Sequence, residues 1–126
     1  MADSSTYTAF VADSHADEGY RDLALAEDGK TWSRTRALGK LAIDGDEARV
    51  AVWIGEPAAY PHGGATGGEA FVVTSGRGSI EIDGLGVFEL VPGTVVVVPP
   101  LTASKLTVTE TLRKVAFASG SFVSKH

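Results

Sequence analysis

Glycine separates short apolar runs in the middle of this 126-residue chain, and the pattern restricts the folds that the chain can form. Nine of the 15 glycines lie between Gly63 and Gly93. Glycine readily adopts positive φ angles, so it suits the tight turns between antiparallel strands. The apolar runs predict strands at Phe71–Thr74, Ser79–Asp83, Val87–Leu90 and Thr94–Val98. Strands at such short intervals indicate an all-β fold, either an antiparallel sandwich or a barrel.

The alternation of polar and apolar residues extends along most of the remaining chain. Tyr7–Val11 is a candidate first strand, whereas Arg21–Asp28 is compatible with a strand or with a short helical element. Further strands are predicted at Thr31–Arg36, Ala48–Ile54, Ser104–Thr107 and Leu112–Ala118.

Two local patterns give sharper expectations. Val95–Val98 has no polar alternation, which predicts a strand that is buried on both faces and ended by Pro99. The segment from Gly76 to Gly78 has the composition of a hairpin turn between two strands.

Composition narrows the class of protein and its partners. The length suits one domain, with residues 1–48 as N-terminal strands and an irregular segment, and residues 49–118 as the motif-bearing part. The net charge is −5 and basic residues do not cluster, which argues against nucleic acid or a membrane surface as partner. No cysteine is present, so disulfides and thiolate chemistry are excluded. No secretion leader or membrane span is visible, and a cytoplasmic location is expected.

The chemistry-bearing residues fall into two pieces of the glycine-punctuated region. His62 and Glu69 flank a glycine-rich turn, and an apolar strand runs from Gly93 to Pro99. The spacings from Glu69 to Gly76 and from Gly93 to Pro99 resemble the two motifs of the cupin superfamily. That resemblance implies a single-domain double-stranded β-helix, or RmlC-like jelly roll, with a ligand cavity inside the barrel.

Two further stretches resemble one branch of that superfamily. Ala51–Gly55 is similar to the strand before the first motif, and Val108–Phe117 is similar to the closing strand, in the ethanolamine-utilisation and ureidoglycine-aminohydrolase-like cupins. The resemblance covers roughly residues 49–117, while residues 1–48 carry little of it.

The departures from the cupin motifs concern the metal ligands. Gly64, Leu101 and Ser104 stand where the second histidine, the second-motif glycine and the third histidine would be, so His62 and Glu69 alone survive of four ligands. First-row metals in proteins usually require three or four donors. The expected cofactor is therefore none, or a weakly bound divalent transition metal.

Without a metal, Glu69 needs another partner inside an apolar barrel, because desolvation disfavours its charge. His62 is the first candidate and Lys105 the second. A Glu69–His62 pair could act as general acid and base, or it could be a structural remnant. Arg113 and Lys114 alternate, so at most one of them faces inward, and both are expected at the surface.

These residues predict a ligand pocket and leave three functions open. The first is a small-molecule-binding cupin with a degenerate metal site. The second, implied by the branch, is a metal-dependent hydrolase or isomerase acting on a small polar metabolite. The third is a non-catalytic structural or regulatory homodimer, since cupins often dimerise by sheet packing. The predicted pocket comprises Tyr60, His62, Glu69, Phe71 and Ser104.

Overall fold

A computed structural model describes residues 9–43 and 45–121, which form eight strands. No helix occurs in these residues, and so none that could span a bilayer. The strands are β1 (Arg21–Leu25), β2 (Trp32–Ile43), β3 (Asp46–Gly55), β4 (Ala58–His62), β5 (Glu69–Ile82), β6 (Gly86–Leu90), β7 (Val95–Val98) and β8 (Ser104–Ser119).

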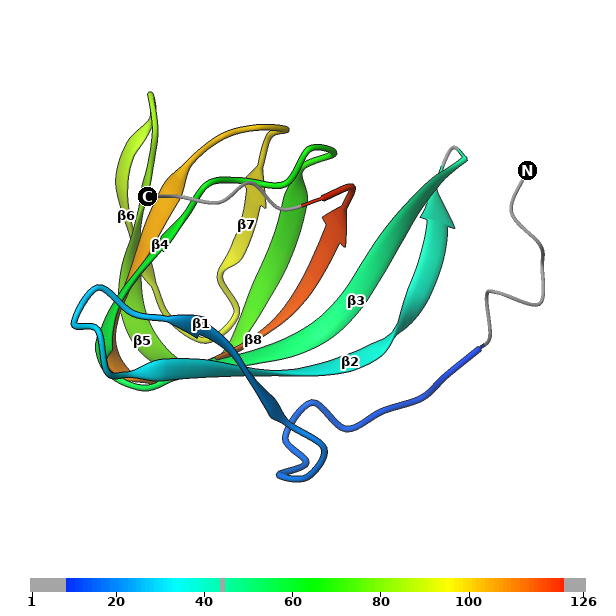
Figure 1. Ribbon diagram of the computed structural model, residues 1–126, viewed down its shortest axis with the longest axis horizontal. Helices are drawn as coiled ribbons and strands as arrows, with labels where there is room; N and C mark the ends of the chain where they lie inside the picture. The colour runs from blue at the N-terminus through cyan, green and yellow to red at the C-terminus, as the bar shows by residue number, and fades with distance from the viewer. Residues whose placement is uncertain (1–8, 44, 122–126) are drawn as a thin grey trace.

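Two long strands, β5 and β8, pair with each other and connect two curved layers. Hydrogen-bonded pairing gives the order β1-β2-β3-β8-β5-β6, with β4 added beside β8 and β7 beside β5. The first half of β8 pairs with β4 and its second half with β3, while the first half of β5 pairs with β7 and its second half with β6. Figure 1 shows β2 and β3 curving around an interior that β4 and β6 close from the other side. This is the antiparallel all-β architecture predicted from the glycine pattern.

The bend in β5 lies at Gly76, where the sequence predicted a turn between two strands. That prediction was wrong, because the chain continues through irregular register between Val73 and Gly78 instead of reversing. Gly76 has a φ of 88°, and a Cβ there would lie 2.1 Å from the Thr111 carbonyl oxygen. A bulge adds twist and bends a strand without ending it. The two strands predicted at Phe71–Thr74 and Ser79–Asp83 are therefore one.

The strand β7 differs from its prediction of burial on both faces. Val96 and Val98 are buried, but Val95 and Val97 are 69% and 67% exposed. The strand pairs with β5 alone, and none of the described residues covers its outer face. A run of valines contains no polar residue that would indicate, from the sequence, which face of the strand is exposed. The predicted homodimer, which would cover part of such a surface, stays a prediction.

Burial on both faces occurs instead in β3. Val52 and Ile54 are buried on one face, and Trp53, on the other, belongs to the core inside the barrel. The apolar outer face of β3 must be covered by other residues. The segment before β1 lies on this outer side of the sheet.

The segment before β1 is held by arginine side chains that point outward from β2 and β8. The Arg113 guanidinium donates hydrogen bonds to the Ser14 carbonyl (2.6 Å) and the Tyr20 hydroxyl (2.7 Å). The guanidinium carbons of Arg34, Arg36 and Arg113 lie 5.7–6.0 Å from the centroid of the Tyr20 ring.

The predicted strand at residues 7–11 is not seen. Tyr7 and Thr8 lie outside the described residues, and residues 9–11 form no strand. The ambiguous region Arg21–Asp28 contains the strand β1. The strand β4 was not predicted, and it contains Pro61, which a strand at a sheet edge tolerates.

Substitution at the bend of β5 tests this architecture. Gly76→Ala should destabilise the protein by about 1–3 kcal/mol more than Gly84→Ala, because its methyl group overlaps the β8 backbone. Gly84 is the matched control: its φ is also positive, at 82°, but a Cβ there would meet nothing within 4 Å. Free energies of unfolding from urea titrations measure the difference. Equal losses in the two variants would contradict the close crossing of β5 and β8.

Candidate functional site

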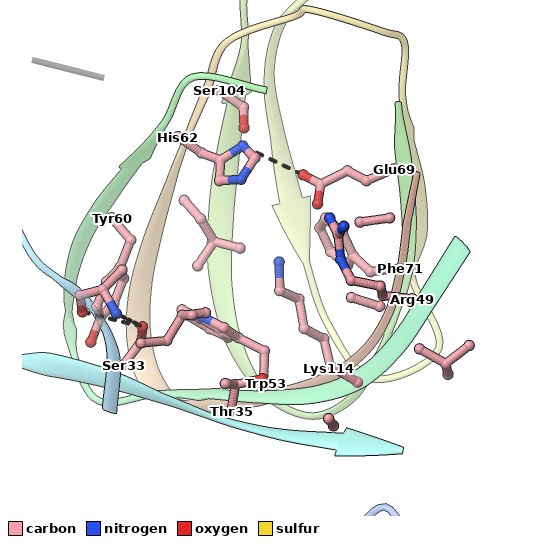
Figure 2. A pocket seen from close by; sticks show the side chains of 18 of the residues that line it. Ser33, Thr35, Arg49, Trp53, Tyr60, His62, Glu69, Phe71, Ser104 and Lys114 are labelled. Atoms are coloured by element: carbon pink, nitrogen blue, oxygen red, sulfur yellow. Dashed lines mark hydrogen bonds and ion pairs between the residues drawn. The ribbon is translucent and has the colours of Figure 1, made fainter. Parts of the chain in front are cut away.

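A cavity of about 340 Å³ lies inside the barrel, lined by side chains of β1 to β5 and β8. Its walls are mostly apolar, which is typical of small-molecule sites. All five residues of the predicted pocket line it: Tyr60, His62, Glu69, Phe71 and Ser104. Figure 2 shows His62, Glu69 and Ser104 at one end and Trp53 and Thr35 at the other. Their part in ligand binding stays a prediction.

Small side chains on the central strand β8 leave the space for this cavity. Cross-strand register places Ala116 between Ala51 of β3 and Phe71 of β5. One pair further along, Ala118 lies between Arg49 and Glu69. Alanine fills little of the interior, so the larger residues on either side project over it into a shared space.

His62 and Glu69 contact each other across the glycine-rich turn. The Nδ1 atom of His62 lies 3.8 Å from Oε1 of Glu69. The backbone N–H of Gly64 donates a hydrogen bond of 3.0 Å to the same Nδ1 atom. Nδ1 therefore acts as an acceptor, which assigns the proton of the neutral ring to Nε2.

The charge state of His62 follows from its surroundings. Burial lowers the pKa of His62, the cation of Lys114 lowers it further, and the carboxylate of Glu69 partly opposes both. The ring is thus neutral at neutral pH. A neutral imidazole with Nε2–H offers a hydrogen-bond donor to the cavity, since that edge of the ring points inward (Figure 2).

The hydroxyl groups of Tyr60 and Ser104 are potential reactive groups of the cavity, but their surroundings indicate other roles. The Tyr60 hydroxyl donates a hydrogen bond of 2.7 Å to the Glu56 carbonyl, and its ring packs edge-on against Trp53 at a centroid distance of 5.1 Å. Burial raises the pKa of Tyr60. The cavity therefore meets the ring and not a reactive hydroxyl. Ser104 is buried and pairs with His62 of β4 and Ile82 of β5.

Lys114 faces the interior, and the prediction that it lies at the surface was wrong. Its Nζ atom is 4.0 Å from the Phe71 ring centroid and 4.9 Å from that of Trp53. Burial lowers the pKa of Lys114, while the Glu69 carboxylate raises it. Leu112 and Ala118 share its parity on β8 and are both buried, so the alternation held the signal for an inward Lys114.

The other lysine and a second cation complete the charge pattern. Lys105 points outward to Glu27, with Nζ 3.3 Å from Oε1, so it is not the partner of Glu69. Arg49 of β3, which is not among the predicted pocket residues, lines the cavity beside Phe71 (Figure 2). Arg21 and Lys40 also line the cavity, so four cations, one carboxylate and a neutral imidazole give its lining a net positive charge, although the whole chain carries −5.

The residues of the cavity do not fit a divalent metal. Residues 9–43 and 45–121 contain no group of three or more His, Cys, Asp or Glu side chains placed to hold one. At Gly64, where a second histidine would stand, φ is 99° and a Cβ would lie 2.6 Å from the Thr102 carbonyl oxygen. A side chain cannot be added there without moving the backbone. The cations of Arg49 and Lys114 further disfavour a dication beside His62 and Glu69.

The pKa of His62 tests this electrostatic description. We expect it to lie below about 6.5, the ordinary value for histidine, because burial and Lys114 disfavour the imidazolium. Lys114→Met should raise this pKa and Glu69→Gln should lower it further. A pH titration by ¹H–¹⁵N NMR, assigned with His62→Gln, reports both the pKa and the Nε2–H tautomer. Shifts of the same sign in the two variants would contradict the assignment.

The same group makes stability depend on pH. Because the pKa of His62 is lower in the folded than in the unfolded state, the unfolded chain binds the proton more readily. The contribution of His62 to stability is therefore complete above about pH 6.5 and is lost as the pH falls towards the folded pKa.

Comparisons with known proteins place this geometry among solved structures. No family model and no curated protein matches the sequence. KdgF from Halomonas sp. superposes with a TM-score of 0.66 at 17% identity, covering 90% of this chain and 96% of that one. EutQ from Clostridium difficile gives 0.64 at 15% identity, covering 79% and 76%. A cupin superfamily protein from Desulfitobacterium hafniense gives 0.59 at 14% identity, covering 71% and 78%. The chain therefore has the cupin, or RmlC-like, jelly-roll fold, as its motif spacings predicted.

Proposed function

We propose that this protein binds a small organic anion inside the barrel, with the carboxylate or an equivalent acidic group against Arg49 and Lys114. The observation that carries the proposal is the sign of the cavity charge: Arg49 and Lys114, together with Arg21 and Lys40, line it with one carboxylate, Glu69, in a chain of net charge −5. Random placement of charge in an acidic protein would favour the opposite sign.

The energetic cost of Lys114 supports a ligand of this kind. An ammonium removed from water is unfavourable unless it is paired, and the rings of Phe71 and Trp53 compensate by only about 0.5–2 kcal/mol. Glu69 is the one carboxylate among the residues that line the cavity. A bound anion would add negative charge beside Lys114, so ligand binding should also raise the pKa of Lys114.

The apolar walls specify the rest of the ligand. Phe71, Ile80 and Leu106 line the cavity and are almost fully buried. They suit an apolar or aromatic body attached to the acidic group. His62 adds a hydrogen-bond donor at one end, which suits an oxygen on the ligand.

A metal-dependent enzyme and a purely structural role are less well supported. The donor set does not fit a metal, and a structural barrel would fill its interior with apolar side chains instead of lining an open cavity with cations. KdgF and EutQ share the fold with this chain, and at 15–17% identity the likeness extends to the fold alone.

Binding of benzoate, compared with neutral benzamide, tests the proposal. Benzoate should raise the melting temperature at constant ionic strength, because a ligand that binds only the folded state stabilises it. Arg49→Met and Lys114→Met should each weaken benzoate binding by roughly 1.5–3 kcal/mol, the usual loss for a hydrogen bond to a charged group. Thermal shift and calorimetric titration measure the two effects.

Matched controls separate a cavity effect from a change in net charge. Arg77→Met and Lys105→Met each remove one cation from ion pairs with Glu110 and Glu27 on the outside, and both should bind benzoate like the wild type. Equal stabilisation by benzoate and benzamide, or equal losses in all four variants, would refute the proposal. Dialysis against Ni²⁺ or Zn²⁺ should leave less than stoichiometric metal in the wild type.

A further inference from the structure

We propose that the cavity takes 2-oxo acids and that the Lys114 amine forms an imine with their carbonyl carbon. This inference rests on the proposed function, since it requires an anion in the cavity, and it adds the identity of the ligand class and a covalent step. The observation behind it is a primary amine at the centre of an apolar cavity, where most anion sites would need only an arginine.

The position of Lys114 suits attack on a bound carbonyl. Its side chain rises from the middle of β8 between Trp53 and Phe71, and the Nζ atom points into the cavity towards the end that carries His62 and Glu69 (Figure 2). The rings of Phe71 and Trp53 contact the amine, and the end of the cavity towards which it points holds His62 and Glu69. Lysines that form Schiff bases are activated by such desolvation, because only the neutral amine is a nucleophile.

The second cation explains why the carbonyl compound should carry a carboxylate. Arg49 lies on β3 across Ala118 from Glu69, and its guanidinium reaches into the same cavity as Lys114. A guanidinium binds a carboxylate through two parallel hydrogen bonds. In a 2-oxo acid the carbonyl carbon is directly bonded to the carboxylate carbon. Holding the carboxylate at Arg49 therefore keeps the electrophile inside the cavity and within the range that the flexible Lys114 side chain sweeps.

Glu69 and His62 are the groups that can serve the proton transfers and hydrogen bonds of this reaction. The ammonium of Lys114 first gives a proton to the Glu69 carboxylate, whose charge acts on Lys114 in this structure. The amine lone pair then forms the N–C bond, and the carbonyl π electrons move to oxygen, which accepts a hydrogen bond from Nε2–H of His62 and takes the proton held by the Glu69 carboxylic acid. The carbinolamine nitrogen then gives a proton to the Glu69 carboxylate, which passes it to the hydroxyl. The C–O bond breaks, one water leaves, and the nitrogen lone pair forms the C=N bond of a protonated imine. No oxidant or reductant is required.

Reductive trapping tests the proposal. Wild-type protein is incubated with pyruvate or phenylpyruvate in the presence of cyanoborohydride, and adducts are measured by intact mass and peptide mapping. We expect one adduct per chain, on Lys114, formed at least tenfold faster than on Lys30, Lys40 or Lys105. Lactate and phenyllactate, which keep the carboxylate but lack the carbonyl, should form no adduct and should slow trapping by competition.

Two variants keep the result interpretable. Lys114→Arg retains the positive charge but cannot form an imine, so it should still bind phenyllactate in a thermal-shift measurement and should give no cavity adduct. Lys105→Met removes an outside lysine and should leave trapping unchanged. Circular dichroism and the melting temperature confirm that both variants fold.

The outcomes distinguish this inference from the proposed function. Stabilisation by phenyllactate without any adduct from phenylpyruvate would overturn the imine and leave anion binding in place. Adducts distributed evenly over the lysines would also overturn it. Failure of both acids to stabilise the protein or to react with it would overturn the two proposals together.

Discussion

The interaction on which the interior depends is the packing of the Lys114 ammonium between the rings of Phe71 and Trp53. A cation in this position costs free energy that apolar packing would not, and replacing buried ionic groups by hydrophobic ones is often neutral or stabilising. The ring contacts and the Glu69 charge compensate in part. The anion that we propose as ligand would offset the remaining cost of this group.

The fold places this cation by means of register. The inner face of β8 presents Leu112, Lys114, Ala116 and Ala118 in succession, and β3 and β5 pair with it on either side. Leu112 fills the interior at one end of this series, and the small side chains of Ala116 and Ala118 leave space at the other end. The bend of β5 at Gly76 allows the same two long strands to contribute to both layers, so that His62 of β4 comes to face Glu69 of β5. The cavity is thus a consequence of small residues on one strand and a bulge in its neighbour.

Much of this arrangement was predictable from the sequence, and what was not has a physical reason. His62, Glu69 and Ser104 were recognised by motif spacing, and the cavity contains all three. Lys114 was missed although Leu112 and Ala118 share its parity, because Val115 and Phe117 on the other parity are equally apolar. Arg49 was not singled out, because it alternates with Val50 and Val52, which are buried on the opposite face of β3. Val95 and Val97 were misplaced because hydrophobicity does not distinguish the inside of a barrel from an uncovered edge.

The small number of metal-binding donors and the cations of the interior have the same electrostatic consequence. Gly64 lies against Thr102 with no room for a metal-binding side chain, and the cations that line the cavity disfavour a dication and favour the anion that we propose. The most direct test is a crystal structure of the protein with 4-bromobenzoate, in which anomalous scattering locates the bromine. The account predicts the bromine among the apolar side chains of the cavity and the carboxylate against Arg49 and Lys114. A cavity without bromine at saturating ligand, or a carboxylate directed away from both cations, would contradict it.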